Sequence, residues 1–275
     1  MINKLLFLAL PILLIVSCNT NPPTSPDVTP TGNVVLTLKV DNTTIVSAAS
    51  KVVIVEDFAN VSCNPCVISN KILESLTEIT YGRSKLVAVK FPTNFPAPND
   101  LFYLAAKEIC DARISYYNVF FAPTTVIDGI LKPISTDSNS VKTAVDSRLS
   151  ITPRFNINIG DNLEGDYSVN VDIKFIDTTS INLSDLAIHT VLTETDIEFE
   201  QAPGSNGETK FYDVTRLMLP SKDGTPVRQL IDQGEIIFTF EDALLSSWNL
   251  EKLNFVVYIQ NKTTKEIFQT GSTFD

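Results

Sequence analysis

The sequence is poor in residues that bind metals through soft atoms, with one histidine and four cysteines among 275 residues. A closed tetrahedral zinc site takes four such ligands. Cys63 and Cys66 form a C-x-x-C pair, and beyond the N-terminal region only Cys110 and His189 remain as soft candidates. His189 falls in a strand pattern far along the chain. We therefore expect no zinc site, and no metal or organic cofactor.

Positive charge and long hydrophobic runs are scarce as well. Lys and Arg together number 21 against 32 Asp and Glu, so the formal net charge is −11. This excess of negative charge argues against nucleic acid as a partner and against electrostatic attraction to anionic lipid. After the N-terminal region, no stretch approaches the roughly 18 consecutive apolar residues of a membrane-spanning helix.

The N-terminal region has the pattern of an export signal. Lys4 precedes an apolar stretch from Leu5 to Val16, which is long enough for a signal peptide and too short to span a bilayer. The stretch ends in Ile15-Val16-Ser17-Cys18, which resembles the lipobox of bacterial lipoproteins. We expect a signal peptide over 1–17, then a lipidated Cys18 and a Pro-rich tether over 18–32. The alternative is an ordinary signal peptide with an incidental cysteine.

The rest of the chain has two halves with different hydrophobic periods. From about Lys51 to Leu149, continuous apolar runs alternate with helical patterns, which predicts a mixed sheet with helices on its faces. From Ile151 onward, apolar and polar residues alternate, which is typical of an antiparallel β-sandwich. We expect an α/β domain over 33–150, including an extra N-terminal strand near 33–40, and an all-β sandwich domain over 151–275.

The C-x-x-C pair stands where a buried strand is followed by a helix. The run KVVIVEDF predicts the strand, and CVISNKILESLTEIT predicts the helix. This order places the Cys63 sulfur at the helix N-terminus, where the helix dipole favours a thiolate. Pro65 suits the first helical turn, and Cys66, one turn further in, could resolve a mixed disulfide formed by Cys63.

This arrangement resembles the thioredoxin superfamily over about 51–149. The resemblance implies that Asp57, six residues before Cys63, is the buried proton acceptor, with Glu56 as the alternative. It also implies that Pro123 in FFAPTTVIDG is the cis-proline that shapes the substrate groove. Two features depart from the pattern: Ser62 stands where thioredoxins usually have Trp, and the longer insert contains a Pro-rich loop, FPTNFPAPND.

The order of a lipoprotein signal, a thioredoxin-like region and a C-terminal β-region, including LAIHTVLTETDIEF and NFVVYIQNKTTKEIFQTG, resembles thioredoxin-like outer-membrane lipoproteins of the Omp type in Bacteroidota. The resemblance covers most of the mature chain, and its specific motifs are the Cys pair and the proline loop. The resemblance implies an α/β thioredoxin-like domain followed by an all-β domain, on a lipoprotein of the outer membrane that faces the periplasm or the cell surface. We expect a thiol–disulfide oxidoreductase that acts on protein thiols or disulfides, with Cys63, Cys66, Asp57 and Pro123 as its site. Membrane attachment is expected through the lipid on Cys18.

Several alternatives stay open at the level of the sequence. The pair at Cys63 and Cys66 could be a static disulfide, although so short a ring constrains the unfolded chain little and would stabilise weakly. Cys110 is either a buried inert thiol or a third redox thiol that relays to Cys66. The chain could also be a binding protein whose thioredoxin-like domain is only a scaffold.

Overall fold

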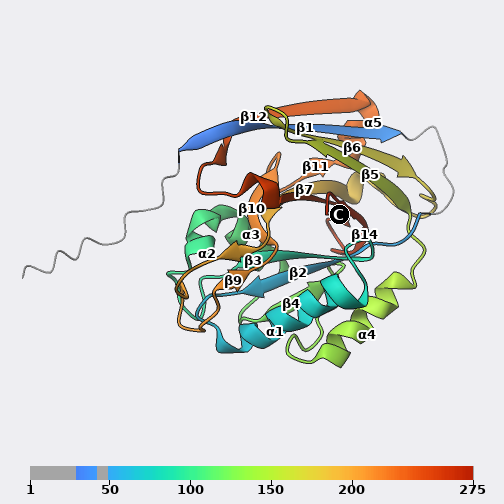
Figure 1. Ribbon diagram of the computed structural model, residues 1–275. Helices are drawn as coiled ribbons and strands as arrows, with labels where there is room; N and C mark the ends of the chain where they lie inside the picture. Colours follow the sequence, from blue (N-terminus) through green and yellow to red (C-terminus); the bar gives the residue numbers. More distant parts are fainter. Residues whose placement is uncertain (1–28, 42–48, 275) are drawn as a thin grey trace, which may run out of the picture.

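Two large β-sheets form the frame of the computed structural model, which describes residues 29–41 and 49–274 (Figure 1). One sheet has four strands in the order β12-β1-β6-β5. The other has eight, in the order β14-β13-β7-β10-β3-β2-β4 with β11 paired to β7. The expected signal peptide and Cys18 lie outside the described residues. None of the helices in the described ranges is long and apolar enough to cross a membrane.

The first half folds as the strand and helix patterns predict. Its elements are β2 (Val53–Ala59), α1 (Asn64–Ser75) with a π-helical turn (Leu76–Thr80), β3 (Leu86–Pro92), α2 (Leu101–Ala105), α3 (Lys107–Tyr117), β4 (Thr124–Ile127) and α4 (Ser138–Leu149). Asp100 caps α2 by accepting from two main-chain nitrogens. After Pro123 the chain forms β4 and a single bridge between Ile127 and Leu131.

The remaining elements are mostly strands. They are β1 (Pro30–Asp41), β5 (Phe155–Asn162), β6 (Tyr167–Phe175), β7 (Leu186–Glu194), β8 (Ile197–Glu198), β9 (Lys210–Phe211), β10 (Val214–Leu219), β11 (Thr225–Pro226), β12 (Glu235–Leu245), β13 (Leu253–Asn261) and β14 (Ile267–Ser272), with short 3-10 turns at Leu183–Asp185 and Leu250–Lys252. The second half also contains a helix that its period-two pattern did not predict, α5 (Val227–Gln233).

The arrangement of these strands differs from the expected division at residue 150. The sheet does not end with the first half, because β10 pairs with β3 and so joins β7, β13 and β14 to β2 and β4. The N-terminal strand β1, expected with the first half, lies instead between β12 and β6, parallel to β6. The second half is therefore not purely antiparallel. Hydrophobic period shows which faces of a strand are buried, but it does not identify the strand's neighbours.

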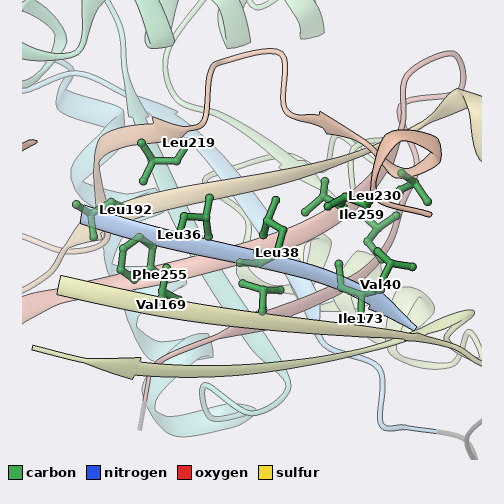
Figure 2. Packing of buried hydrophobic residues seen from close by; sticks show 14 of the residues in the cluster. Leu36, Leu38, Val40, Val169, Ile173, Leu192, Leu219, Leu230, Phe255 and Ile259 are labelled. Carbon is green, nitrogen blue, oxygen red and sulfur yellow. The ribbon is translucent and has the colours of Figure 1, made fainter. Parts of the chain in front are cut away.

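The largest apolar core fills the space between the two sheets. Figure 2 shows residues of β1 and β6 packed against residues of β7 and β13: Leu36, Leu38, Val40, Val169 and Ile173 on one side, and Leu192, Phe255 and Ile259 on the other. The two sheets thus form a sandwich, but unlike the expected separate domain over 151–275 it includes β1, and one of its layers is continuous with the sheet of the first half. This explains why every residue of β7 is buried, since both of its faces are covered.

Alternate residues of β2 face opposite sides of the larger sheet. Val53 and Val55 pack in the cluster that contains Leu73 of α1 and Val145 of α4. Ile54 and Phe58 pack instead with Tyr117 of α3 and with strands of the second half. Helices α1 and α4 therefore cover one face of β2, and α3 lies on the other (Figure 1).

Candidate dithiol site

Cys63 and Cys66 form a disulfide at the start of α1. Cys63 is the N-cap of the helix, and its sulfur accepts a hydrogen bond from the main-chain nitrogen of Cys66 at 3.2 Å. Pro65 lies in the first helical turn, as the sequence predicts. The Cys63 sulfur thus stands at the positive end of the helix dipole, where a thiolate is favoured once the disulfide is reduced.

Asp57 lies on the dithiol side of the sheet. Ala59, two residues further along β2, packs against both cysteines, and residues two apart on a strand share a face. The Asp57 carboxyl is fully buried; Thr125 donates to its Oδ1 at 3.2 Å, while Oδ2 has no hydrogen-bond partner among the described residues. Burial raises the pKa of Asp57, and the nearby Lys90 ammonium opposes that rise.

Glu56, the alternative acid, faces the opposite side of the sheet. Its carboxylate accepts hydrogen bonds from Arg113 of α3 and from the hydroxyl of Tyr117. All three side chains are buried or nearly so. Glu56 therefore holds a buried ion pair under α3, and Asp57 is the acid on the side of the C-x-x-C pair.

Pro123 borders the site from a third side. The Ala122–Pro123 peptide bond is cis, as the resemblance implies, and Ala122 packs against the two cysteines. Beside it lies a groove of about 400 Å³ whose walls include Pro65, Phe121, Pro123, Lys132 and Ile134.

The Pro-rich insert supports the loop that carries the dithiol. Asn60 donates to the carbonyl oxygens of Thr93 and Ala97 at 2.6 and 2.9 Å, and the main-chain nitrogen of Val61 donates to the Asp100 carboxylate at 2.8 Å. The sequence identified this insert as a Pro-rich departure from the thioredoxin pattern. It gave no sign that Asn60 and Asp100 tie the two loops together, because those contacts are long-range.

A segment of the second half, residues 204–208, covers the dithiol loop. The main-chain nitrogen of Asn206 donates to the Val61 carbonyl oxygen at 3.2 Å, and that of Ser205 donates to the Ser62 hydroxyl at 3.2 Å. Cys63 is only 2% exposed and Cys66 is not exposed. Sequence reasoning missed this contact; the only local signal is the run of turn residues in APGSNGE.

Cys110 and His189 lie apart from the dithiol. Cys110 is buried against Tyr103 and Ala106, with Ile114 beside it, and burial raises the pKa of its thiol well above the ordinary range. Its helix, α3, is on the opposite face of the sheet from Cys66, so the contacts do not support a relay between the two.

His189 is buried in β7 and stacks on Tyr258, with ring centroids 5.1 Å apart. Burial and the Arg113 charge lower the pKa of this imidazole well below its ordinary range. Within 29–41 and 49–274, no three His, Cys, Asp or Glu side chains are grouped so as to hold a metal ion.

Comparison with known proteins identifies a similar fold but no family. No family model matches the sequence, and no curated protein matches it either. Two solved structures are similar at 12% sequence identity, each over 82% of this chain. HBP35 of Porphyromonas gingivalis aligns over 76% of its length with a TM-score of 0.62, and a protein of Agrobacterium tumefaciens over 95% with a TM-score of 0.51. The likeness supports a thioredoxin-like fold.

Proposed function

We propose that this protein is an exported, lipid-anchored thiol–disulfide oxidoreductase. The observation that carries the proposal is the meeting of three features at one place. A disulfide lies at the N-terminus of α1, a buried carboxyl, Asp57, lies on the same face of the sheet, and cis Pro123 follows the residue that packs against both cysteines. A purely structural disulfide needs neither the buried acid nor the proline.

The proposed chemistry is a two-electron exchange. In the reducing direction the Cys63 thiolate attacks one sulfur of a substrate disulfide, forming a mixed disulfide and releasing the other sulfur as a thiolate. Cys66 then loses its proton to the Asp57 carboxylate and attacks the Cys63 sulfur. The second substrate sulfur leaves as a thiolate and takes the proton held by Asp57, and the first released thiolate takes a proton from solvent. The substrate ends as a dithiol and Cys63–Cys66 ends oxidised, and a thiol reductant returns the pair to the dithiol for the next turnover. The oxidising direction reverses these steps.

The groove beside Pro123 suits an extended polypeptide substrate. Phe121 and Ile134 are 67% and 65% exposed at its walls. Exposed apolar side chains of this size are typical of surfaces that bind a partner. We therefore propose protein thiols or disulfides as substrates, with an apolar side chain near the reacting cysteine.

The proposed location rests on the sequence alone. Cys18 ends a lipobox-like segment and is followed by a Pro-rich stretch, and a lipid there would attach the folded part to a membrane without a spanning helix. We propose the outer membrane, in line with the Omp-type lipoproteins that the chain resembles. A location outside the cytoplasm also suits the proposed chemistry, because disulfides form and persist in oxidising compartments.

Turnover by a cysteine variant tests the proposed reaction. With a thiol reductant as the electron source, Cys63→Ser should abolish the protein-catalysed reduction of a peptide disulfide with an apolar residue beside its cysteine, because the attacking sulfur is gone. Cys110→Ala is the matched control, since it removes a buried thiol on the opposite face of the sheet and should leave the rate unchanged. An unchanged rate in Cys63→Ser would refute the proposal.

A second candidate is a binding protein whose thioredoxin-like part is a scaffold. The 2% exposure of Cys63 favours it, because an exchange reaction needs an approaching sulfur to reach that atom. In this case the disulfide would resist glutathione and the wild-type protein would show no turnover. The two candidate functions thus predict different results in the same turnover assay.

A further inference from the structure

Residues 204–208, which we call the cap segment, are hydrogen-bonded to the loop that precedes Cys63. Two main-chain nitrogens of the segment donate hydrogen bonds, one to the Val61 carbonyl oxygen and one to the Ser62 hydroxyl, in the two residues immediately before Cys63. The Asn206 amide also lies 3.5 Å from the carbonyl oxygen of Cys63, at the limit of a hydrogen bond. The second half of the chain thus directly contacts the residue proposed to react.

The cap segment is anchored by a chain of polar side chains. The Glu208 carboxylate accepts from Asn206 at 2.7 Å and from the Asn70 amide of α1 at 2.8 and 3.0 Å. Asn70 in turn accepts from the Lys90 ammonium at 2.6 Å. Because a charged acceptor strengthens hydrogen bonds, Glu208 is the main side-chain link between the cap segment and α1.

The fit of the cap segment depends on the absence of a side chain. A Cβ on Gly204 would lie 2.1 Å from the carbonyl oxygen of Val61, so no other residue fits there without a shift of the segment. Ser62 accepts the hydrogen bond from Ser205 at the position where thioredoxins usually have Trp. A small residue at 62 and glycine at 204 together allow the close contact.

We propose that the cap segment controls the reactivity of the dithiol and must open before Cys63 can react. Cys63 is only 2% exposed, and the cap segment is hydrogen-bonded to the two residues before it and lies against its carbonyl oxygen. On this proposal the reaction rate scales with the fraction of molecules in which the segment is open. This proposal rests on the proposed function for its purpose, but its claim about sulfur access is argued from the burial of Cys63 and from the contacts of the cap segment to Val61, Ser62 and the Cys63 carbonyl oxygen. It assigns the second half a role at the dithiol.

The first test places a side chain between the cap segment and the loop. Gly204→Ala should increase, by about tenfold, the rate at which tris(2-carboxyethyl)phosphine reduces Cys63–Cys66 in the full chain. It should raise the alkylation of reduced Cys63 by iodoacetamide similarly. Gly160→Ala is the matched control, because Gly160 lies on β5 with open space around its Cβ position. Equal rates in Gly204→Ala, Gly160→Ala and wild type would overturn the proposal.

A second test removes the anchor instead. Glu208→Ala should raise both rates several-fold, and Glu200→Ala, an exposed carboxylate of the same connection, should not. If Gly204→Ala fails to fold, the test rests on Glu208→Ala alone. Reduction and alkylation rates of Glu208→Ala equal to those of Glu200→Ala would then refute the proposed role of the cap segment. Faster chemical reduction without any turnover of peptide disulfides would uphold the cap and refute the oxidoreductase. If wild type and the cap-segment variants turn over peptide disulfides equally and are reduced by the phosphine at equal rates, the oxidoreductase proposal would be upheld and the cap-segment proposal refuted.

Discussion

Glu56 and Asp57 are consecutive residues of β2, yet their carboxyl groups lie on opposite faces of the sheet and have different polar neighbours. Glu56 is paired with Arg113, whereas one oxygen of Asp57 has no hydrogen-bond partner among the described residues. The alternation of a strand produces this separation. Glu56 thus lies in an ion pair with Arg113, and Asp57 lies on the dithiol side of the sheet.

Asp57→Asn should make the protein more stable at neutral pH. Burial raises the pKa of Asp57 in the folded state, so the fold holds this proton more tightly than the unfolded chain does. The carboxyl therefore lowers the free energy of unfolding as pH rises above its ordinary pKa. We expect a gain of about 1–3 kcal/mol for the variant at pH 7–8, vanishing towards pH 3, by urea unfolding.

The same substitution should slow the proposed reaction. An amide cannot accept the Cys66 proton, so turnover should fall roughly 100-fold. The control is Asp146→Asn: Asp146 is exposed and Lys142 lowers its pKa, so the neutral-pH gain should be absent. A variant that is neither stabilised nor slowed would mean that Asp57 has no part in proton transfer.

Arg113 should be among the most sensitive positions in the core. Arg113→Met leaves the Glu56 carboxylate buried without its partner, which typically lowers the free energy of unfolding by about 3–5 kcal/mol. The double variant Glu56→Gln with Arg113→Met removes both charges and should recover much of that loss. Denaturant unfolding of the two single variants and the double variant measures the coupling; additive losses would contradict a buried pair.

Substitutions in the groove should weaken substrate binding without affecting the fold. Phe121→Ser removes an apolar side chain that is 67% exposed and should lower kcat/KM for an apolar peptide disulfide about tenfold, mainly through KM. Ile79→Ser is the control, because Ile79 is 82% exposed on the π-helical turn after α1. Equal effects of the two substitutions would mean that the groove does not bind substrate.

Cys18 should carry the membrane anchor. In cells, Cys18→Ser should move the protein from the membrane fraction to the soluble fraction, because the lipid has no other proposed attachment site. Mass spectrometry of the N-terminal peptide should show acyl chains on wild type and none on the variant. A wild-type peptide that begins elsewhere or lacks lipid would show that the lipobox resemblance is misleading.

The sequence predicted what depends on local order. The strand before Cys63 and the helix after it follow from short-range pattern, whereas a buried acid at Asp57 and a cis Pro123 follow from the resemblance. These features place the dithiol and its acid. They need no knowledge of how the two halves meet.

The sequence could not predict the contacts between the halves. The pairing of β10 with β3 and the position of β1 depend on which strand edges meet in three dimensions. The cap segment depends on Gly204 fitting over Val61, two residues far apart in the chain. Period-two patterns identify strands but carry no such information, so the link between the second half and the dithiol appeared only in the structure.

The reduction potential of Cys63–Cys66 tests the central claim most directly. The full chain would be equilibrated with defined ratios of reduced and oxidised glutathione, trapped by alkylation and measured by mass, with Cys63→Ser as the blank. The account predicts a value within the range of exchange proteins, roughly −120 to −270 mV. A value below about −300 mV would identify a structural disulfide and contradict the proposed oxidoreductase.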